Sequence, residues 1–482
     1  MPAQDILAWA RTKPTGRAVI YQDQALTYAE FANCLTQSAR FFKNYPLEPG
    51  RTAVIVIDNL LVCWLALFAL RGLGLDTITV QSLEQARALR VRNVACVVFA
   101  ESERSKIGTD RELDGAPTII FADEFILRAR GVSSSPAGLF ADRIGGHFLY
   151  TSGTTGTYKR LLFEADSAER GSGVTDRELS LNPETIYHNL FFPPFTGAGF
   201  KWPLFVWQRG GCVIFDQRGE ALLDIFNHDI TVTVAVPAML EKLLTLLEQH
   251  PRPRGNFRLF TGGSFVSRQL AERVRDLVTP DVTVLYSSSE CSTMAGAKFN
   301  TVEDLVWLTP AQGRTLKIVR EDGSICGIDE EGDLGVLVTE HDRQGYADDP
   351  ETTARVFRDG YFFPGDMAVR RADGKIRILG RTQDVINVGG FKLATAPLEL
   401  EIGQYLGARA VCLLATQTAA GENDLVVAVE ADTDPTPVQV ARIKAHFESA
   451  PTRIVRMANF PRGSSAMQKV DRRALRKLVF ED

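Results

Sequence analysis

A glycine- and threonine-rich segment that ends in a lysine is the part of the chain best suited to bind phosphate. Tyr150 to Lys159 reads YTSGTTGTYK and directly follows an apolar strand pattern. Glycines let a backbone approach a ligand closely, small hydroxyls and N–H groups donate to phosphate oxygens, and Lys159 supplies a positive charge. The spacing differs from the Walker A pattern, so a P-loop kinase or GTPase is disfavoured. A flexible Ser/Thr/Gly turn without a ligand is the alternative interpretation.

Strand and helix patterns alternate over the first third of the chain, and they must position this segment. Buried-type strands are indicated at TAVIVI (52–57), DTITV (76–80), ACVVFA (95–100), APTIIFA (116–122) and HFLYTS (147–152). Thr27 and Glu30 have the spacing of a capping box, which predicts a helix running to about Lys43. The alternation indicates an α/β fold with a largely parallel sheet. In such sheets ligands bind beyond the carboxyl ends of the strands, where the Gly/Thr segment lies.

The pattern of expected strands and helices changes twice over the rest of the chain. Short strand patterns recur at 212–216, 232–236, 258–261 and 282–286. From about residue 310, alternating strands separated by Asp-Gly turns indicate an antiparallel β subdomain. The last hundred residues contain apolar strands at 410–416 and 424–431 and an amphipathic helix near 437–448, which is enough for a small α+β domain.

Composition excludes several classes of protein. The 482 residues carry a net charge of −5 and are 45% hydrophobic, which excludes a disordered or collagen-like chain and gives no electrostatic case for nucleic-acid binding. Seven dispersed cysteines without a CxxC pair argue against a disulfide framework or a zinc site and favour reduced thiols. The apolar stretch Leu60–Leu70 is too short to span a bilayer and predicts a buried helix. With no signal-peptide pattern at the start, we expect a cytoplasmic protein without a membrane span.

YTSGTTGTYK resembles the phosphate-loop signature of the adenylate-forming (AMP-binding) superfamily, which includes acyl-CoA synthetases, firefly luciferase and peptide-synthetase adenylation domains. Tyr158 stands where the family usually has proline, and Arg160 where it has glycine. Further signatures follow in the family's order at TGGSF (261–265), YSSSE (286–290), DPETTARVFRDGYFFPGD (349–366) and Gly380-Arg381. Five matches in order, over nearly the whole chain, make a chance resemblance improbable.

The resemblance implies a role for each matching residue. The expected ATP-binding residues are Thr151, Ser152, Gly153, Thr154, Thr155, Gly156, Gly262, Gly263, Ser264, Tyr286, Ser287, Asp366 and Arg381. The Tyr286 ring would pack on adenine, Asp366 would accept from the ribose hydroxyls, and Glu290 with Thr154 would hold Mg²⁺. Without a ligand, the same residues would be surface, turn or core positions.

The C-terminal region carries the remaining signatures. The segment PRGSSAMQKVDRRAL (461–475) resembles the stretch that bears the family's catalytic lysine, here Lys469, although Gln468 replaces a glycine and two extra residues precede it. Lys469, Glu290 and Lys159 form the implied catalytic set. Gln383 would be the hinge about which a mobile domain of residues 382–482 rotates relative to a large, multi-subdomain N-terminal domain of residues 1–381. Gly389, Gly390 and Phe391 would line the path of the pantetheine arm of coenzyme A.

The implied reaction joins a carboxylic acid to ATP as an acyl-adenylate, releases pyrophosphate, and then forms a thioester with coenzyme A. The acid would bind near Phe195, Thr196 and Gly197, and the phenylalanines of this region suggest an apolar or aromatic acid, although most are expected to be core residues. An amino acid is disfavoured, because no aspartate lies between 188 and 215 to pair with an ammonium group. Two alternatives remain: acyl transfer to a carrier-protein thiol, and a non-catalytic nucleotide-binding protein.

Overall fold

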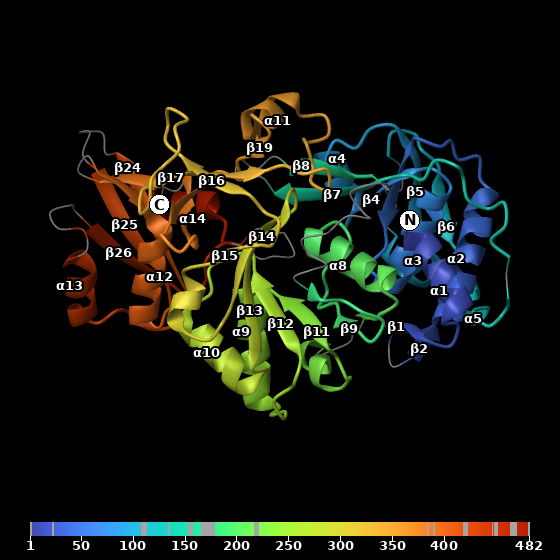
Figure 1. The fold of residues 1–482 in the computed structure, drawn as a ribbon, viewed down its shortest axis with the longest axis horizontal. Coiled ribbons are helices and arrows are strands. Elements are labelled where there is room, and N and C mark those ends of the chain that lie inside the picture. Colours follow the sequence, from blue (N-terminus) through green and yellow to red (C-terminus); the bar gives the residue numbers. More distant parts are fainter. Residues whose placement is uncertain are drawn as a thin grey trace.

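The protein is described from a computed structural model. The structure describes residues 2–21, 24–107, 113–133, 135–152, 158–164, 179–215, 221–382, 385–388, 391–417, 423–445, 447, 452–462 and 470–480. Figure 1 shows the N-terminal elements on the right, a large sheet in the centre and the C-terminal elements on the left.

The central sheet is mostly parallel. Over the described residues it has nine strands in the order β15-β14-β13-β12-β11-β9-β10-β1-β2. Their bounds are β1 (Arg17–Tyr21), β2 (Gln24–Thr27), β9 (Ile186–His188), β10 (Cys212–Phe215), β11 (Val232–Ala235), β12 (Arg258–Gly262), β13 (Asp281–Ser288), β14 (Ser292–Lys298) and β15 (Thr309–Pro310). The run from β13 to β1 is parallel, and β14, β15 and β2 are antiparallel to their neighbours. The predicted strands at 212–216, 232–236, 258–261 and 282–286 are therefore confirmed.

A second sheet contains the strands predicted in the first third of the chain. Its order over the described residues is β6-β5-β3-β4-β7-β8. The bounds are β3 (Thr52–Val56), β4 (Asp76–Thr79), β5 (Val94–Ala100), β6 (Thr118–Phe121), β7 (His147–Ser152) and β8 (Tyr158–Phe163). All pairs are parallel except β7 with β8, which follow each other in the chain and pair as an antiparallel hairpin.

Helices cover both sheets. Those outside the C-terminal region are α1 (Pro2–Thr12), α2 (Tyr28–Lys43), α3 (Leu60–Gly72), α4 (Leu83–Ala88), α5 (Asp123–Arg128), α8 (Gly197–Gln208), α9 (Pro237–Gln249), α10 (Arg268–Leu277) and α11 (Pro350–Val356), with 3-10 turns η1 (Glu101–Lys106), η2 (Ala221–Phe226) and η3 (Val302–Leu305). The predicted capping box is present at the start of α2, where the Thr27 and Glu30 side chains each bond to the other residue's backbone N–H. Every residue of α3 is buried, as its all-round apolar sequence predicts.

Aromatic packing fixes α8 against the N-terminal helices. The Trp64 ring of α3 stacks on Phe200 of α8 at 5.7 Å between centroids and meets Trp207 of α8 edge-on at 5.2 Å. Phe31 of α2 also contacts Trp207, at 5.3 Å. Close-packed aromatic groups of this kind leave a helix little freedom to shift. The start of α8, where the acid pocket is predicted, is therefore held in a fixed position by the packing of this helix against α2 and α3.

The antiparallel β subdomain predicted after residue 310 is confirmed. It contains β16 (Leu316–Val319), β17 (Glu331–Leu337), β18 (Phe357–Arg358), β19 (Tyr361–Phe362), β20 (Asp366–Arg370) and β21 (Ile376–Arg381), and every pair is antiparallel. The C-terminal region follows with β22 (Val385–Val388), β23 (Phe391–Ala394), α12 (Thr395–Leu406), β24 (Ala410–Gln417), β25 (Asn423–Glu430), α13 (Pro437–Ala445), β26 (Thr452–Met457) and α14 (Arg472–Phe480). The strands β24, β25 and β26 form a small mixed sheet, and the sequence patterns did not indicate β26.

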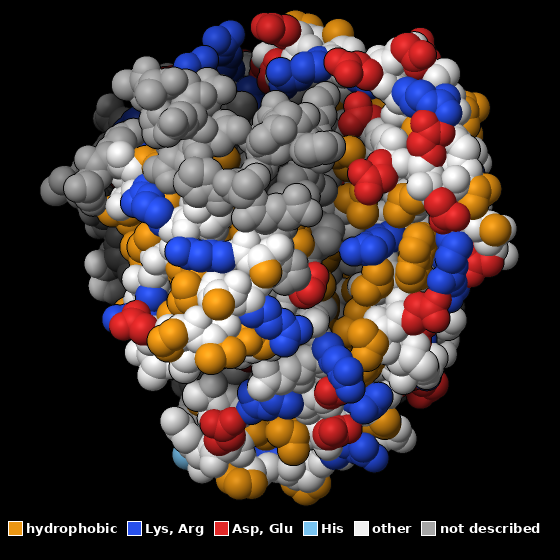
Figure 2. All heavy atoms as spheres, turned by 90° about the vertical axis from the view of Figure 1, so that its left-hand side faces the viewer, with side chains coloured by type: hydrophobic (Ala, Val, Ile, Leu, Met, Phe, Trp, Pro, Cys, Tyr) orange, Lys and Arg blue, Asp and Glu red, His pale blue; other side chains and the backbone are white. Residues whose placement is uncertain are grey.

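The hydrophobic clusters divide at about residue 380. Three clusters draw their buried members from residues before this point, and two others, around Leu425 and Val426 of β25, draw only on later residues. Of the described helices, none combines the length and apolarity needed to cross a bilayer. On the face in Figure 2, the described Lys and Arg side chains are interspersed with Asp and Glu. The described part of this face therefore shows no large basic surface of the kind that nucleic-acid binding requires.

Candidate active site

The predicted adenine-binding residues lie together at the carboxyl ends of two neighbouring strands. Gly262, the last residue of β12, pairs with Leu285 of β13, and Tyr286 comes next on β13. A side chain at Gly262 would place its Cβ 2.3 Å from the Leu285 carbonyl oxygen, so the close approach of the two strands requires glycine there. Gly263 follows with φ +86°, and Ser264 and Ser287 are exposed. This edge of the parallel sheet is where the fold class places ligands.

Three of the predicted ATP-binding side chains form one cluster. Asp366 opens β20 and is paired in register with Arg381, the last residue of β21. Arg381 Nε lies 2.9 Å from Asp366 Oδ1, and the Tyr286 hydroxyl donates to Asp366 Oδ2. Burial raises the pKa of the Tyr286 phenol well above its usual value, and the adjacent carboxylate raises it further. A buried carboxylate is thus held beside an aromatic ring, in the arrangement that a nucleoside with two ribose hydroxyls would need.

A second cluster joins Glu290 to Lys159 through a tyrosine that the sequence patterns did not single out. Glu290 is buried just beyond the end of β13, and its Oε1 accepts a hydrogen bond from the Tyr346 hydroxyl at 2.7 Å. The Lys159 ammonium lies 5.1 Å from the centroid of the Tyr346 ring. Burial lowers the pKa of Lys159, and the nearby Glu290 carboxylate opposes that shift. Two of the three predicted catalytic residues, one on β8 and one in the turn after β13, therefore lie against the same tyrosine.

The donor set suits magnesium held partly by a substrate. Glu290 offers carboxylate oxygen, which Mg²⁺ prefers, and Mg²⁺ commonly binds through one or two carboxylates together with substrate phosphates. Within the described ranges there is no group of three or more His, Cys, Asp or Glu residues that could form an all-protein metal cage. A single buried carboxylate beside a lysine fits a metal ion that arrives with a polyphosphate.

Arg160, which replaces the family's glycine, forms an ion pair across to the loop before α11. Its guanidinium donates to Asp348, and its backbone carbonyl accepts from the Ala347 N–H at 2.8 Å. The pKa of Arg160 is lowered by burial, while Asp348 opposes the shift. The β7–β8 hairpin, which carries Lys159, is in this way attached to the segment that contains Tyr346.

The predicted acid pocket adjoins the turn that bears Glu290. Phe195 is buried, and its ring stacks on Tyr150 of β7 with centroids 4.7 Å apart. Thr196 caps α8, because its hydroxyl oxygen accepts from the Gly199 N–H at 2.9 Å. A Cβ at Gly197 would lie 3.3 Å from Ser289 Oγ, so the start of α8 touches the turn that bears Glu290. Most other aromatic residues of this stretch belong to the core, as expected: Phe192, Phe200 and Trp202.

Several predicted site residues lie outside the described residues or have undescribed side chains. Those outside are Gly153, Thr154, Thr155, Gly156, Gln383, Gly389, Gly390, Gln468 and Lys469. Thr151 and Ser152 form the end of β7, and Phe391 begins β23, with backbone alone described. Their roles stay predictions.

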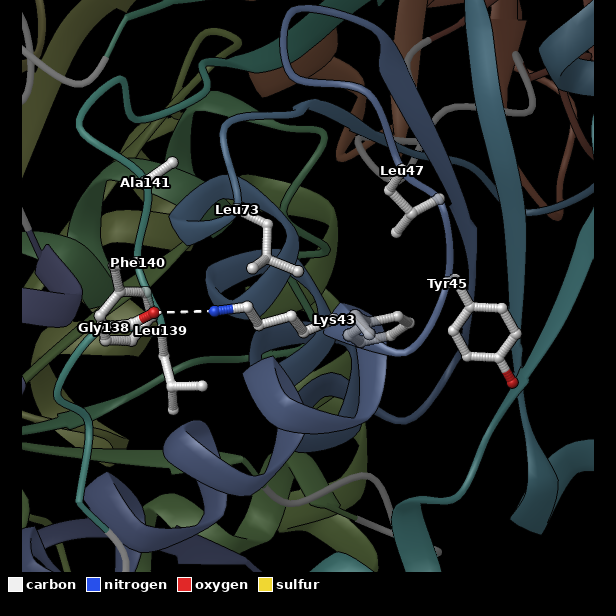
Figure 3. Close-up of a pocket in the computed structure, with 9 residues that line it drawn as sticks. Lys43, Tyr45, Leu47, Leu73, Gly138, Leu139, Phe140 and Ala141 are labelled. Carbon is white, nitrogen blue, oxygen red and sulfur yellow. Dashed lines mark hydrogen bonds between the residues drawn. The ribbon is translucent and has the colours of Figure 1, made fainter.

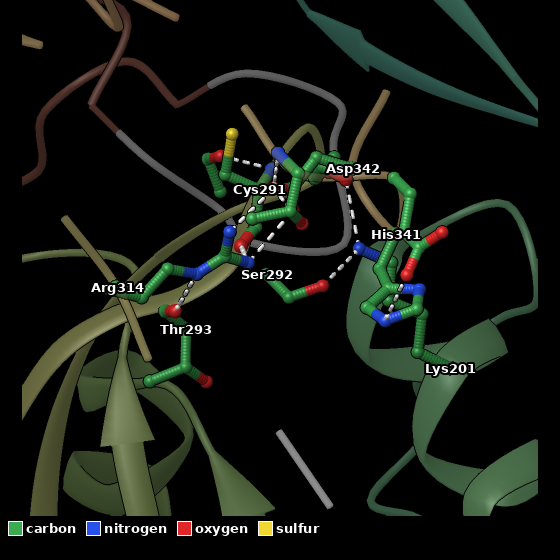
Figure 4. Close-up of polar contacts among 11 residues, drawn as sticks. Lys201, Cys291, Ser292, Thr293, Arg314, His341 and Asp342 are labelled. Atoms are coloured by element: carbon green, nitrogen blue, oxygen red, sulfur yellow. Dashed lines mark hydrogen bonds and ion pairs between the residues drawn. The ribbon is translucent and has the colours of Figure 1, made fainter. Parts of the chain in front are cut away.

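Charged residues that the sequence patterns did not indicate contact the turn that bears Glu290. Figure 4 shows Lys201, Arg314 and Asp342 with the residues that follow Glu290. Arg314 and Asp342 form an almost fully buried bidentate ion pair, with Nη1–Oδ2 and Nη2–Oδ1 distances of 2.5 and 2.8 Å. Lys201 of α8 donates to the Ser289 carbonyl oxygen at 2.8 Å and to Ser292 Oγ at 2.7 Å. The one sequence signal was a lysine inside the otherwise apolar stretch GFKWPLFVW.

A pocket in the N-terminal region contains none of the predicted site residues. It has a volume of about 280 Å³ and is lined by residues of α2, of the loop after it and of the stretch 138–141. Lys43 donates to the Gly138 carbonyl oxygen across it at 2.8 Å (Figure 3). We assign it no part in the chemistry of the site.

Comparison with known proteins places the chain in a family. The family model described as AMP-binding enzyme matches residues 6–338, so the chain belongs to the AMP-binding enzymes. It is 26% identical to the salicyl-AMP ligase / salicyl-S-ArCP synthetase of Mycobacterium tuberculosis, over 93% of this chain and 85% of that protein. It is 27% identical to the 2-hydroxy-7-methoxy-5-methyl-1-naphthoate–CoA ligase of Streptomyces carzinostaticus, over 59% of this chain and 52% of that relative's length.

The solved structures show the same fold. O-succinylbenzoate coenzyme A synthetase from Bacillus subtilis, in complex with ATP and a magnesium ion, has a TM-score of 0.81 at 19% identity, and the match covers 98% of each chain. The α/β architecture with a large N-terminal and a small C-terminal part is therefore that of the adenylate-forming enzymes, as the motif order predicted.

Proposed function

We propose that this protein activates a carboxylic acid with ATP through an acyl-adenylate and then transfers the acyl group to the thiol of coenzyme A. The observation that carries the proposal is the convergence of Lys159 and Glu290 on Tyr346, beside a separate cluster of Tyr286, Asp366 and Arg381. One cluster suits a polyphosphate and the other a nucleoside. The order of the family's signatures supports joining them into one ATP site.

In the first step a carboxylate oxygen of the acid bonds to the α-phosphorus of ATP, and pyrophosphate leaves. Negative charge grows on the phosphate oxygens, so a nearby ammonium stabilises the transition state by several kcal/mol. Lys159 supplies this charge from the β7–β8 hairpin. Mg²⁺ bound by Glu290 would neutralise further phosphate charge. Lys469 is proposed to bridge the attacking carboxylate and the phosphate.

In the second step a thiol loses its proton to solvent and its sulfur bonds to the acyl carbon. The bond from that carbon to the phosphate oxygen breaks, and AMP leaves with the electron pair. We propose that residues 382–482 rotate about Gln383 between the steps and that Gly389, Gly390 and Phe391 line the thiol's path. The separate hydrophobic clusters on either side of residue 380 support two bodies that can move relative to each other.

An aromatic or other apolar acid is the proposed substrate class. The stacked Phe195 and Tyr150 rings provide an apolar wall beside the start of α8. Two relatives are named for salicylate and for a substituted hydroxynaphthoate, both aryl acids. The first of these names also includes a carrier protein, so transfer to a carrier-protein thiol is the second candidate.

The test is a pyrophosphate-release screen over aryl, fatty and short dicarboxylic acids, with coenzyme A, with a phosphopantetheinylated carrier protein, and with neither. We expect release with aryl acids and thioester formation with coenzyme A. Glu290→Gln should lower the rate, and Glu124→Gln, at an exposed carboxylate on α5, is the control. Thioester formed on the carrier protein alone would select the second candidate. ATP binding without release from any acid would refute the enzyme and favour a nucleotide-binding protein.

A further inference from the structure

The short turn that bears Glu290 is held by three different segments of the chain. Its three successive backbone carbonyls, of Ser289, Glu290 and Cys291, each accept a hydrogen bond from a basic residue. The donors are the Lys201 ammonium at 2.8 Å, the backbone N–H of Arg343 at 3.0 Å and the Arg314 guanidinium, in that order. Because all three carbonyls are fixed by groups outside the turn, the direction of the Glu290 side chain is set by tertiary contacts.

Of these donors, Lys201 is the one that reaches the turn from the acid pocket. It lies on the first turns of α8, four residues after Gly197, and Figure 4 shows it extending from this helix toward Ser292. Its ammonium is also 4.7 Å from the centroid of the Phe163 ring of β8. The side chain therefore contacts α8, the Glu290 turn and the hairpin that carries Lys159.

Burying the Lys201 ammonium costs free energy, because the charged group loses its water. Burial lowers the pKa of its ammonium to about 8, and the guanidinium of Arg343 lowers it as well. The acidic groups Asp342 and Glu290 oppose this shift. A buried ammonium is stabilised only by the acceptors it meets, so the bonds to Ser289 and Ser292 must be well formed to keep it there.

We propose that Lys201 is a positioning residue for the metal-binding carboxylate: by holding the carbonyl that precedes Glu290, it ties the orientation of Glu290 to the helix that begins at the acid pocket. The inference rests on the proposed function of Glu290. Lys201 acts through Glu290 and is not proposed to contact a substrate. Partners that orient a metal ligand typically change metal affinity or activity by about 10–100-fold when they are removed.

The experiment compares Lys201→Met, which keeps most of the side-chain volume and removes the donor, with Lys298→Met. Lys298 is an exposed lysine on β14 that pairs with Asp281 at 3.0 Å, and its loss should change nothing at the site. ATP binding is titrated by calorimetry at several Mg²⁺ concentrations. We expect Lys201→Met to need about tenfold more Mg²⁺ for the same ATP affinity. An unchanged Mg²⁺ dependence would overturn the inference.

Two further variants separate positioning from a general loss of structure. Lys201→Gln retains a donor for the Ser289 carbonyl and should recover part of the Mg²⁺ dependence, and it also serves if Lys201→Met does not fold. In a Glu290→Gln background, Lys201→Met should change the Mg²⁺ dependence of ATP binding little further, because both changes act on the same carboxylate. Fully additive effects would refute the positioning role. Pyrophosphate release by the wild type is measured separately, so failure of the proposed reaction is distinguished from failure of this inference.

Discussion

We expect the buried, neutral ring of His147 to make the stability of this protein sensitive to mild acid. The residue begins β7 and is fully buried, with its ring stacked on Phe200 at 4.4 Å. Nε2 lies 3.1 Å from the Pro194 carbonyl oxygen, which can only accept, so Nε2 carries the proton and Nδ1 accepts from the Thr77 hydroxyl at 2.8 Å. Burial, and secondarily Arg71, lowers the pKa of His147 to about 3.

The magnitude follows from the difference between the folded and the unfolded pKa. An unfolded chain takes up the proton near pH 6.5, whereas the folded chain resists it down to about pH 3. The unfolded state thus binds more protons in this window, and stability falls as the pH is lowered through it. One pKa unit corresponds to about 1.4 kcal/mol, so between pH 7.5 and pH 5 this group should remove about 2 kcal/mol from the free energy of unfolding.

The assay is urea unfolding followed by far-UV circular dichroism at pH 7.5 and pH 5, for the wild type and for His147→Gln. Glutamine offers a donor and an acceptor but does not titrate in this range. The wild type should lose about 2 kcal/mol more than the variant over this interval. His250→Gln, at an exposed histidine, should retain the wild-type dependence. If His147→Gln and the wild type lose equal stability, the reasoning about the buried neutral ring is wrong.

Two other substitutions test the site, and a third tests the stability of the fold. Asp366→Ala should weaken ATP binding by about tenfold or more, because hydrogen bonds to a charged group contribute about 1.5–3 kcal/mol. The affinity for the acid should stay nearly unchanged. Calorimetry with each ligand measures both affinities, and an unchanged ATP affinity contradicts the ribose role. Lys469→Ala should abolish adenylation and retain most ATP binding, and adenylation at the wild-type rate would remove Lys469 from the mechanism. Arg314→Met leaves Asp342 buried without its guanidinium and should lower the unfolding free energy by about 3–5 kcal/mol. Thermal unfolding tests it, and a melting temperature equal to that of wild type would show that this pair does not stabilise the fold.

The sequence was most informative where local patterns carry the signal. Apolar and β-branched runs predicted β3 to β7 of one large sheet and β10 to β13 of the other, and the Thr27–Glu30 spacing predicted the start of α2. The strands β1, β2, β8, β9, β14 and β15 were not predicted. Motif order then indicated which strand ends would carry the site. The cluster of Tyr286, Asp366 and Arg381 was predicted as a set of roles, although its hydrogen bonds were not.

What the sequence did not indicate depends on contacts between distant segments. Tyr346 meets Glu290 across 56 positions, and Lys201 meets Ser289 across 88, so no local spacing reports either pair. Arg314 and Asp342 lie in what reads as ordinary polar sequence. They become a buried ion pair because the loop after β17 brings Asp342 to Arg314, whose guanidinium also donates to the Cys291 and Thr293 carbonyl oxygens. Such pairs follow from packing rather than from pattern.

The placement of the tryptophans has a practical consequence for any study of this protein. All five of them, Trp9, Trp64, Trp202, Trp207 and Trp307, precede the point near residue 380 where the hydrophobic clusters divide. Intrinsic tryptophan emission therefore reports mainly on the first part of the chain. Loosening of the sheet formed by β24, β25 and β26 should leave tryptophan emission nearly unchanged, and a single fluorescence midpoint then describes the first part of the chain rather than the whole.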